Sequence, residues 1–379
     1  MAKALVSDFD VMTPLGDSIE EFTEGLFSGR SGISNLNGLY GSDFPVSAVG
    51  MIPGLNGKRE PMSVAVHLVR KILSRQSDAF IDGVVFFMSQ DDELSNSRSP
   101  ISCDEQILLL QKEIFEHARY EIPRERIIVI REGCVAGLTG LAMAAQRIRA
   151  GRWRRALVLG VDLRCSPLDL LRFHVLGALS TRDASRASSP FSIERDGFVK
   201  SQAAGVFLLS DESSLKSGER IWGEIKGFGQ TSDAWRLTEG RPDGSESRRA
   251  MEAALRMSGL VPCQIDCVSA HATGTRIGDA VEARTIRALW GSHADQLPVT
   301  ALKSQLGHSL QTSGLSQVAA ALLMLRHQRL APTLHCDSMD PMCALNLVAY
   351  EARAANLNHV LCNASGFGGQ NACLILGNA

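Results

Sequence analysis

Short apolar runs alternate with longer amphipathic stretches along most of the chain. Runs rich in β-branched and aromatic residues predict buried strands in the first part at residues 83–88, 126–130, 156–161 and 205–209. The same pattern predicts strands in the second part at residues 221–228, 265–270, 297–302, 358–363 and 372–376. Apolar residues at helical spacing predict helices over residues 135–149, 246–258, 278–289 and 313–326. This rhythm predicts an α/β fold of two stacked halves.

A polar segment separates the two parts. Residues 211–220 read Asp-Glu-Ser-Ser-Leu-Lys-Ser-Gly-Glu-Arg between two strand candidates, which is typical of a loop. We therefore expect an N-terminal half at residues 1–215 and a C-terminal half at residues 216–379. With 379 residues and 45% apolar content, the chain is long enough for two domains or two closely packed halves.

Composition and charge exclude several classes of protein. The net charge of −2 gives no bulk attraction for nucleic acid or anionic lipid. The chain has no eighteen-residue apolar run and its first residues lack the apolar stretch of a signal peptide, so we expect neither a membrane span nor secretion. Nine cysteines without zinc-type spacing suit a reducing compartment and no metal site. These features predict a cytoplasmic globular protein.

Cys134, in Glu-Gly-Cys-Val-Ala-Gly, stands where a predicted strand gives way to a predicted helix. The helix dipole and the unpaired N–H groups at a helix N-terminus favour a thiolate, so a lowered thiol pKa and a nucleophilic role are expected here. The alternative is a buried structural cysteine, the commoner fate of a cysteine flanked by apolar residues.

Two histidine motifs follow at the ends of later strands. His271, in His-Ala-Thr-Gly-Thr, comes directly after a predicted strand, where α/β folds gather their chemistry. Lys303 and His308 bracket Ser-Gln-Leu-Gly after another strand. Asp279 and Glu282 begin a predicted helix, where they either cap its N-terminus or orient the histidines. A thiol followed by two imidazoles in this order predicts nucleophilic catalysis.

The motifs together resemble those of the β-ketoacyl-[acyl carrier protein] synthases, condensing enzymes of the thiolase superfamily. The similarity runs nearly end to end. Besides the Cys134, His271 and His308 motifs, it is carried by Met-Thr-Pro-Leu-Gly at 12–16, Gly-Ala-Leu-Ser at 177–180, Pro-Phe-Ser-Ile-Glu-Arg-Asp-Gly-Phe-Val at 190–199, Gly-Phe-Gly-Gln-Thr-Ser-Asp-Ala at 227–234 and Asn-Ala-Ser-Gly-Phe-Gly-Gly-Gln-Asn at 363–371. The resemblance implies a five-layered αβαβα sandwich of two related halves, in a homodimer or a heterodimer with a related subunit.

The resemblance also implies a mechanism and its residues. Cys134 would accept an acyl group from the phosphopantetheine thiol of an acyl carrier protein, and His271 and His308 would bind a malonyl thioester while it loses carbon dioxide and attacks that acyl group. Lys303 would keep the histidines correctly protonated. The N–H groups of Cys134 and Phe367 would form an oxyanion hole, and Phe367 would gate the acyl tunnel. The supporting residues would be Asp279, Glu282, Thr273, Thr275 and Gly368. No metal or redox cofactor is implied.

Several positions depart from the family pattern. Glu132 places a carboxylate close to the nucleophile, which would oppose thiolate formation if it points inward. Gln202 and Gln317 stand where glutamate is usual, and Ala272 stands where glycine is usual. We expect an unusual carboxylate relay and acyl pocket. Such departures from the family pattern favour a specialised type II polyketide or aryl polyene pathway over housekeeping fatty-acid elongation.

A cluster of arginines supplies the candidate docking surface for an acidic carrier protein. Near the end of the helix after Cys134 it comprises Arg147, Arg149, Arg152, Arg154 and Arg155. The alternative is that these cations complement the helix dipole and stay solvated.

Three other functions are alternatives for a chain with these motifs. A biosynthetic thiolase would carry a second cysteine in a Cys-x-Gly context near the C-terminus, which Cys373 does not match. A catalytically inactive, chain-length-factor-like subunit would keep the fold without acyl transfer. A malonyl-carrier decarboxylase would need the histidines but not Cys134.

Overall fold

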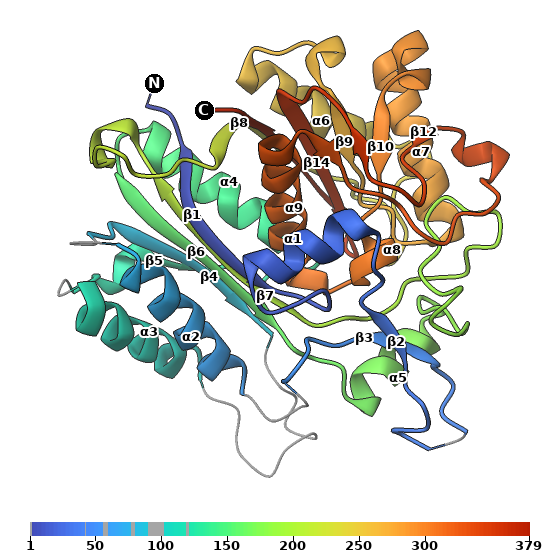
Figure 1. Cartoon of the computed structure of the whole chain (residues 1–379), viewed down its shortest axis with the longest axis horizontal. Helices are drawn as coiled ribbons and strands as arrows, with labels where there is room; N and C mark the ends of the chain where they lie inside the picture. Colours follow the sequence, from blue (N-terminus) through green and yellow to red (C-terminus); the bar gives the residue numbers. More distant parts are fainter. Residues whose placement is uncertain (1, 42, 56–59, 77–79, 90–101, 119–120) are drawn as a thin grey trace.

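One long mixed sheet runs through the molecule (Figure 1). The computed structural model describes residues 2–41, 43–55, 60–76, 80–89, 102–118 and 121–379. Within them the sheet has 11 strands in the order β12-β10-β9-β14-β15-β8-β1-β7-β6-β4-β5. At its centre, β1 and β8 are joined by only two residue pairs, Leu5 with Glu224 and Val6 with Gly223. The sheet is therefore two smaller sheets that meet edge to edge.

The two smaller sheets have the same topology. The first consists of β1 (Leu5–Met12), β7 (Ala203–Ser210), β6 (Arg155–Asp162), β4 (Gly83–Met88) and β5 (Ile127–Val129). The second consists of β8 (Gly223–Ser232), β15 (Gln370–Gly377), β14 (His359–Gly366), β9 (Cys267–Ser269) and β10 (Pro298–Thr300), with β12 (Asn346–Leu347) at its edge. In each, the first three strands run antiparallel and the next pairings are parallel.

The helices form three layers around these sheets, as Figure 1 shows. One outer layer contains α2 (Pro61–Ser74) and α3 (Cys103–Ala118), and the other contains α6 (Ser245–Ser258) and α7 (Arg276–Trp290). Between the sheets lie α4 (Ala136–Arg149) and α9 (Ser313–His327). The remaining elements are α1 (Ile19–Ser28), α5 (Pro167–Val175), α8 (Lys303–Leu306), the pair β2 (Ile33–Asn35) and β3 (Ala48–Gly50), and the pair β11 (Arg329–Leu330) and β13 (Arg353–Ala354).

Side chains that alternate along each strand divide the apolar interior into three main clusters. On β4, Val85 and Phe87 face the central helices, whereas Val84 and Phe86 face α2 and α3. In the second sheet, Leu361 packs toward α6 and α7 and its neighbours pack toward the centre. Both faces of both sheets are buried, which is why their strands read as continuous apolar runs.

The central helices approach each other closely at their N-terminal ends. A Cβ atom on Gly137 of α4 would lie 2.8 Å from the nitrogen of Leu315, and one on Gly314 of α9 would lie 2.7 Å from the nitrogen of Leu138. Only glycine permits this approach. It brings the segments that precede α4 and α9 side by side, and these segments carry Cys134 and His308.

The expected α/β class and five-layered αβαβα sandwich are confirmed by this arrangement and by the solved structures described below. The predicted strands and helices are all present with small shifts at their ends. β1 was not predicted, because its Asp8 and Asp10 interrupt the apolar pattern; both pair with Arg75, which directly follows α2. The boundary at residue 215 stays a prediction; it falls between β7 and β8.

Candidate active site

Cys134 lies in the turn between β5 and α4. The helix begins at Ala136 and has Val135 as its N-cap, so the thiol sits beside the unpaired N–H groups of the first turn. Only 9% of the Cys134 surface is exposed. A Cβ atom on Gly366 would lie 3.5 Å from the Cys134 nitrogen, so the turn after β14 packs directly against the nucleophile.

His308 faces this thiol. Its Nε2 lies 3.1 Å from Cys134 Sγ. The His308 N–H donates to the Val199 carbonyl at 2.7 Å, and the Ser201 N–H donates to the His308 carbonyl at 3.1 Å, so extended backbone clamps the residue. The Phe198 ring meets the imidazole edge to face with centroids 5.1 Å apart. The ring therefore has little freedom to turn away from the thiol.

His271 follows β9 and stands next to Lys303. Lys303 Nζ lies 3.4 Å from His271 Nδ1 and also donates to the His271 carbonyl. A charged lysine can only donate, so Nδ1 accepts and the ring proton is on Nε2. Glu282 accepts from the N–H groups of His271 and Ala272, each at 2.7 Å, and from Asn363 Nδ2 at 2.6 Å. This carboxylate anchors the histidine loop.

The loop after His271 is held by Asp279. Its carboxylate accepts from the N–H groups of Gly274 at 3.0 Å and Phe191 at 2.8 Å. Burial, together with the nearby Glu282, raises the pKa of Asp279 to about 7, although the two N–H groups and Arg195 oppose the rise. Asp279 and Glu282 thus bind loop N–H groups, which favours the orienting role over simple helix capping.

Burial sets the ionisation of the reacting groups. It raises the pKa of the Cys134 thiol to about 11, although Lys303 acts in the opposite direction. The expectation of a lowered thiol pKa is therefore wrong for this structure, because desolvation outweighs the helix N-terminus. Burial and the Lys303 charge hold the pKa values of His271 and His308 well below their usual range. Burial lowers the pKa of Lys303 to about 8, with Glu282 opposing.

The site at neutral pH thus contains a neutral thiol, two neutral imidazoles and a buried cation. A thiol with a neutral imidazole 3.1 Å away has an acceptor for its proton. Two neutral imidazoles can donate hydrogen bonds to an oxygen on which negative charge develops. The arrangement fits acyl transfer followed by stabilisation of an enolate.

Cys134, His271 and His308 border one cavity of about 450 Å³. Phe367, in the turn between β14 and β15, lies at its rim with 39% of its surface exposed. Gly368 follows with a φ of 92° and donates its N–H to the Leu237 carbonyl at 2.6 Å. Thr273 and Thr275, whose hydroxyls are 3.2 Å apart, line the wall near His271. The structure brings together the predicted nucleophile, histidines, lysine and supporting residues.

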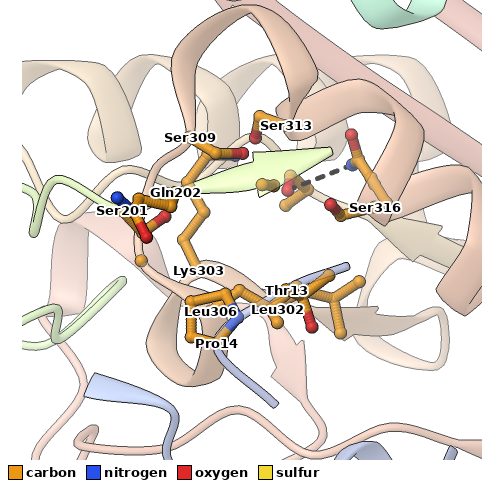
Figure 2. Close-up of a pocket in the computed structure, with 14 residues that line it drawn as sticks. Thr13, Pro14, Ser201, Gln202, Leu302, Lys303, Leu306, Ser309, Ser313 and Ser316 are labelled. Atoms are coloured by element: carbon orange, nitrogen blue, oxygen red, sulfur yellow. Dashed lines mark hydrogen bonds between the residues drawn. The ribbon is translucent and has the colours of Figure 1, made fainter. Parts of the chain in front are cut away.

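A second, much smaller cavity lies behind Lys303 (Figure 2). Its volume of about 10 Å³ suits roughly one water molecule. Ser309, Ser313 and Ser316 line one side, and Thr13, Pro14 and Leu306 line the other. The stem of Lys303 therefore borders polar as well as apolar surface.

The departures from the family pattern have local explanations. The Glu132 carboxylate accepts from Thr139 Oγ1 on α4 at 2.7 Å and is not among the largest influences on the Cys134 pKa. Gln202 Nε2 donates to the Leu163 carbonyl at 2.9 Å, and Gln317 Nε2 donates to the Ser269 carbonyl at 2.7 Å. A carboxylate could not donate these bonds, so the amides suit their surroundings.

Ala272 is a strained position in the His271 loop. Its φ of 31° lies in the left-handed region, which favours the glycine usual at this position. The strain persists because Glu282 binds the N–H groups of Ala272 and His271.

The arginine cluster is not one docking surface. Arg155 is buried and pairs with Glu219 at 2.7 Å, and Arg149 donates to the Ile225 and Lys226 carbonyls. Arg147 and Arg154 stack on Trp153 and Phe80, while Arg152 is exposed. Moreover, the cluster lies at and just after the C-terminal end of α4, about 21 Å from the end that carries Cys134. Arg155 is buried and cannot contact a carrier protein, so the docking prediction is wrong for that residue; for the other four arginines it stays a prediction.

Three residues beside the histidines were not predicted from the sequence. Phe198 contacts the His308 ring, Asn363 contacts Glu282, and Lys200 lies on the segment that clamps His308. Phe198 stands in the quoted Gly-Phe-Val motif, so its signal was present. Nothing in the local sequence indicated that the side chain of Lys200 is buried.

Comparison with known proteins identifies the family. Residues 127–214 match the model of the beta-ketoacyl synthase N-terminal domain, and residues 222–337 match that of the C-terminal domain. Together these matches cover more than half of the chain. The chain belongs to the β-ketoacyl synthase family of carbon–carbon bond-forming acyltransferases, which confirms the predicted resemblance.

Relatives extend this match to the whole chain. A 3-oxoacyl-[acyl-carrier-protein] synthase 2 from Synechocystis sp. is 28% identical over 411 residues, covering 98% of this chain and 97% of the relative. An actinorhodin polyketide putative beta-ketoacyl synthase 1 from Streptomyces coelicolor is 34% identical over 256 residues, covering 67% and 55%. The structure titled the ishigamide ketosynthase/chain length factor matches with a TM-score of 0.82 and 26% identity, covering 100% and 99%.

Proposed function

We propose that this chain condenses an acyl group held on Cys134 with a malonyl thioester, releasing carbon dioxide. The observation that carries the proposal is the convergence of Cys134, His308 and the Lys303-bound His271 on one cavity. Both substrates would arrive on the phosphopantetheine thiol of an acyl carrier protein. A metal or redox cofactor is not needed for these steps.

In the first half-reaction, Cys134 Sγ attacks the thioester carbonyl. The thiol proton passes to His308 Nε2, 3.1 Å away, and then to the departing pantetheine sulfur. Negative charge on the tetrahedral oxygen needs fixed donors, which the N–H groups of Cys134 and Phe367 would supply, since both residues line the same cavity. Because the resting thiol has a raised pKa, proton transfer to His308 accompanies the attack.

In the second half-reaction, the malonyl thioester loses its carboxylate as carbon dioxide. The electron pair of that bond forms an enolate, whose oxygen accepts a hydrogen bond from His271 Nε2–H and a second from His308 when the ring proton of His308 is on Nε2. The enolate carbon then attacks the acyl carbonyl, and the Cys134 thiolate leaves and takes a proton from water to restore the thiol. Lys303 keeps the proton of His271 on Nε2, which supplies the donor.

The partner that we propose is an acidic acyl carrier protein docked at the cavity mouth. Arg276, at the first position of α7, is exposed and lines the cavity, beside Ile277 with 51% of its surface exposed. A cation beside apolar surface suits an acidic partner that must be oriented over the mouth. This site replaces the arginine cluster after α4.

We also propose that the chain pairs with a second copy or a related subunit. β5 ends the sheet, and α3 exposes Leu108 at 62% and Phe115 at 54% on the same side of the molecule. An edge strand beside exposed apolar surface is typical of an interface. The ishigamide structure, whose title names a ketosynthase and a chain length factor, supports the heterodimer as one form.

We also propose where in the cell the protein works and which pathway it serves. The nine free cysteines suit the reducing cytoplasm. No helix of the described residues is long and apolar enough to cross a membrane. We propose that the protein serves a specialised polyketide or polyene pathway. The departures from the family pattern at Glu132, Gln202 and Gln317 support this proposal.

The test is intact-protein mass spectrometry after incubation with a panel of acyl-loaded carrier proteins. We expect an acyl adduct on the natural chain and none on Cys134→Ala. Adding malonyl-loaded carrier protein should then remove the adduct and release a product longer by two carbons. Absence of any adduct, with every donor and with a related subunit present, would favour the inactive chain-length-factor-like alternative. Decarboxylation by Cys134→Ala without condensation by the natural chain would favour the decarboxylase.

A further inference from the structure

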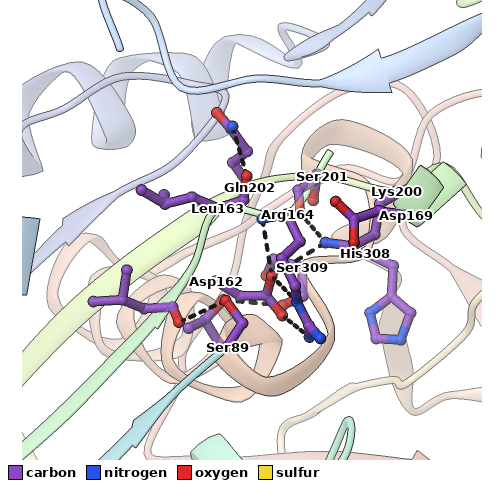
Figure 3. A network of polar contacts seen from close by, with 12 residues as sticks. Ser89, Asp162, Leu163, Arg164, Asp169, Lys200, Ser201, Gln202, His308 and Ser309 are labelled. Atoms are coloured by element: carbon purple, nitrogen blue, oxygen red, sulfur yellow. Dashed lines mark hydrogen bonds and ion pairs between the residues drawn. The ribbon is translucent and has the colours of Figure 1, made fainter. Parts of the chain in front are cut away.

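A fully buried ion pair lies behind the active site (Figure 3). The side chains of Lys200 and Asp162 are both 0% exposed, and Lys200 Nζ lies 3.5 Å from Asp162 Oδ1. Nζ also donates to the Ser201 carbonyl at 2.9 Å. Asp162 accepts from Arg164 Nη2 at 2.8 Å, so its charge has two partners. Burying charged groups is costly unless they are paired, and each partner here depends on the other.

The backbone of Lys200 is part of the clamp on His308. Lys200 and His308 form a parallel β-bridge, in which Val199 accepts from the His308 N–H and the Ser201 N–H donates to the His308 carbonyl. On the other side, the Gly50 N–H donates to the Lys200 carbonyl at 3.0 Å. The segment therefore lies between β3 and His308, and its side chain is tied to the end of β6. A shift of Lys200 would move the imidazole.

The two charges of the pair also contribute to the electrostatic potential at the Cys134 thiol. The charged groups that shift the pKa of the Cys134 thiol most are Lys303, Asp162 and Lys200. The neutral ring of His308 contacts the thiol, and the His271 ring meets the His308 ring with centroids 5.4 Å apart. Lys303 and Lys200 lower the Cys134 pKa, whereas Asp162 raises it. Burial tends to raise the pKa of Asp162, but Lys200 and Arg164 outweigh burial and keep it low, so the carboxylate stays charged.

We propose that the buried Asp162–Lys200 pair tunes the reactivity of Cys134, both through its two charges and through its hold on the segment that aims His308. Lys200 holds the segment that aims His308 at Cys134, and Asp162 compensates the charge that Lys200 brings into the interior. The inference rests on Cys134 as the nucleophile of the proposed function. Its readout is direct alkylation of that thiol, so it can fail while acyl transfer stands.

The experiment compares Lys200→Met, Asp162→Asn and the double variant by the alkylation rate of Cys134 at pH 8. Loss of the cation should reduce the thiolate fraction and slow alkylation by up to about tenfold, about one pKa unit. Loss of the anion should accelerate alkylation severalfold. The double variant should lie between the two. A purely structural pair would change the rate in the same direction in both single variants.

Arg155→Met is the matched control. Arg155 is also a buried, paired cation on β6, but it lies at the opposite end of the strand from Asp162, about 23 Å away. It should lower the melting temperature and leave Cys134 alkylation within about twofold of the natural chain. Thermal melts establish that each variant is folded. If Lys200→Met does not fold, Lys200→Gln takes its place. Changes of equal sign in the two single variants, or no change in either, would overturn the proposal.

Discussion

At the scale of the residue, the reactivity of Cys134 depends on competition between burial and a nearby cation. The helix N-terminus, by itself, favours a thiolate. In the structure, desolvation is the largest contribution and raises the thiol pKa to about 11, while Lys303 reduces the rise. The sequence predicted Cys134 as the nucleophile but not the protonation state of its thiol, because burial depends on residues from both halves.

This residue-scale result predicts an unusual pH dependence. Alkylation requires the thiolate, whose fraction rises about tenfold per pH unit below the pKa. We expect the alkylation rate of Cys134 by iodoacetamide to rise continuously from pH 7 to pH 9.5 without a plateau. Peptide-resolved mass spectrometry separates Cys134 from the exposed Cys263. A plateau near pH 7 would show that a thiolate is present at rest.

At the scale of the element, the crossing of α4 and α9 sets the distance between the nucleophile and His308. The Gly137–Gly314 contact is so close that a methyl group on either residue would meet backbone atoms at 2.7 to 2.8 Å. Backbone cannot move aside as a flexible side chain can, so the helices would have to separate.

We therefore expect Gly137→Ala to lower the free energy of unfolding by about 1–3 kcal/mol, the usual cost of overpacking. It should also slow acyl transfer, because Cys134 precedes α4 and His308 precedes α9. Urea denaturation and the adduct assay measure the two effects. Gly133→Ala is the matched control for stability, since a Cβ atom there meets no atom within 4 Å. Equal stability of the two variants would contradict the packing argument.

At the scale of the whole molecule, the fold decides which arginines face the substrate. The cluster of five after Cys134 is compact in sequence, yet Arg155 is buried, Arg149 is half-buried, and the cluster lies at the far end of α4 from Cys134. Arg276, from the other half of the chain, stands at the cavity mouth.

We expect Arg276→Ala to raise the KM for the carrier protein by roughly fivefold, as for loss of one exposed ion pair. The kcat should change less, because the residue lies outside the reacting groups. Arg152→Ala, which removes an exposed arginine of the cluster, should leave KM unchanged. Steady-state kinetics at low salt measures both, and raising the ionic strength should weaken the Arg276 effect. The reverse ranking would restore the cluster as the docking site.

The sequence by itself determined the α/β class, most strands and helices, the family and the identity of Cys134, His271, Lys303 and His308. These follow from local periodicity and from motifs, each of which lies within a few residues of chain. Only the tertiary structure decided the 3.1 Å contact of Cys134 with His308, the raised thiol pKa and the burial of the Asp162–Lys200 pair. Each of these depends on segments far apart in the chain that the two stacked halves bring together, and desolvation is a property of the packed interior.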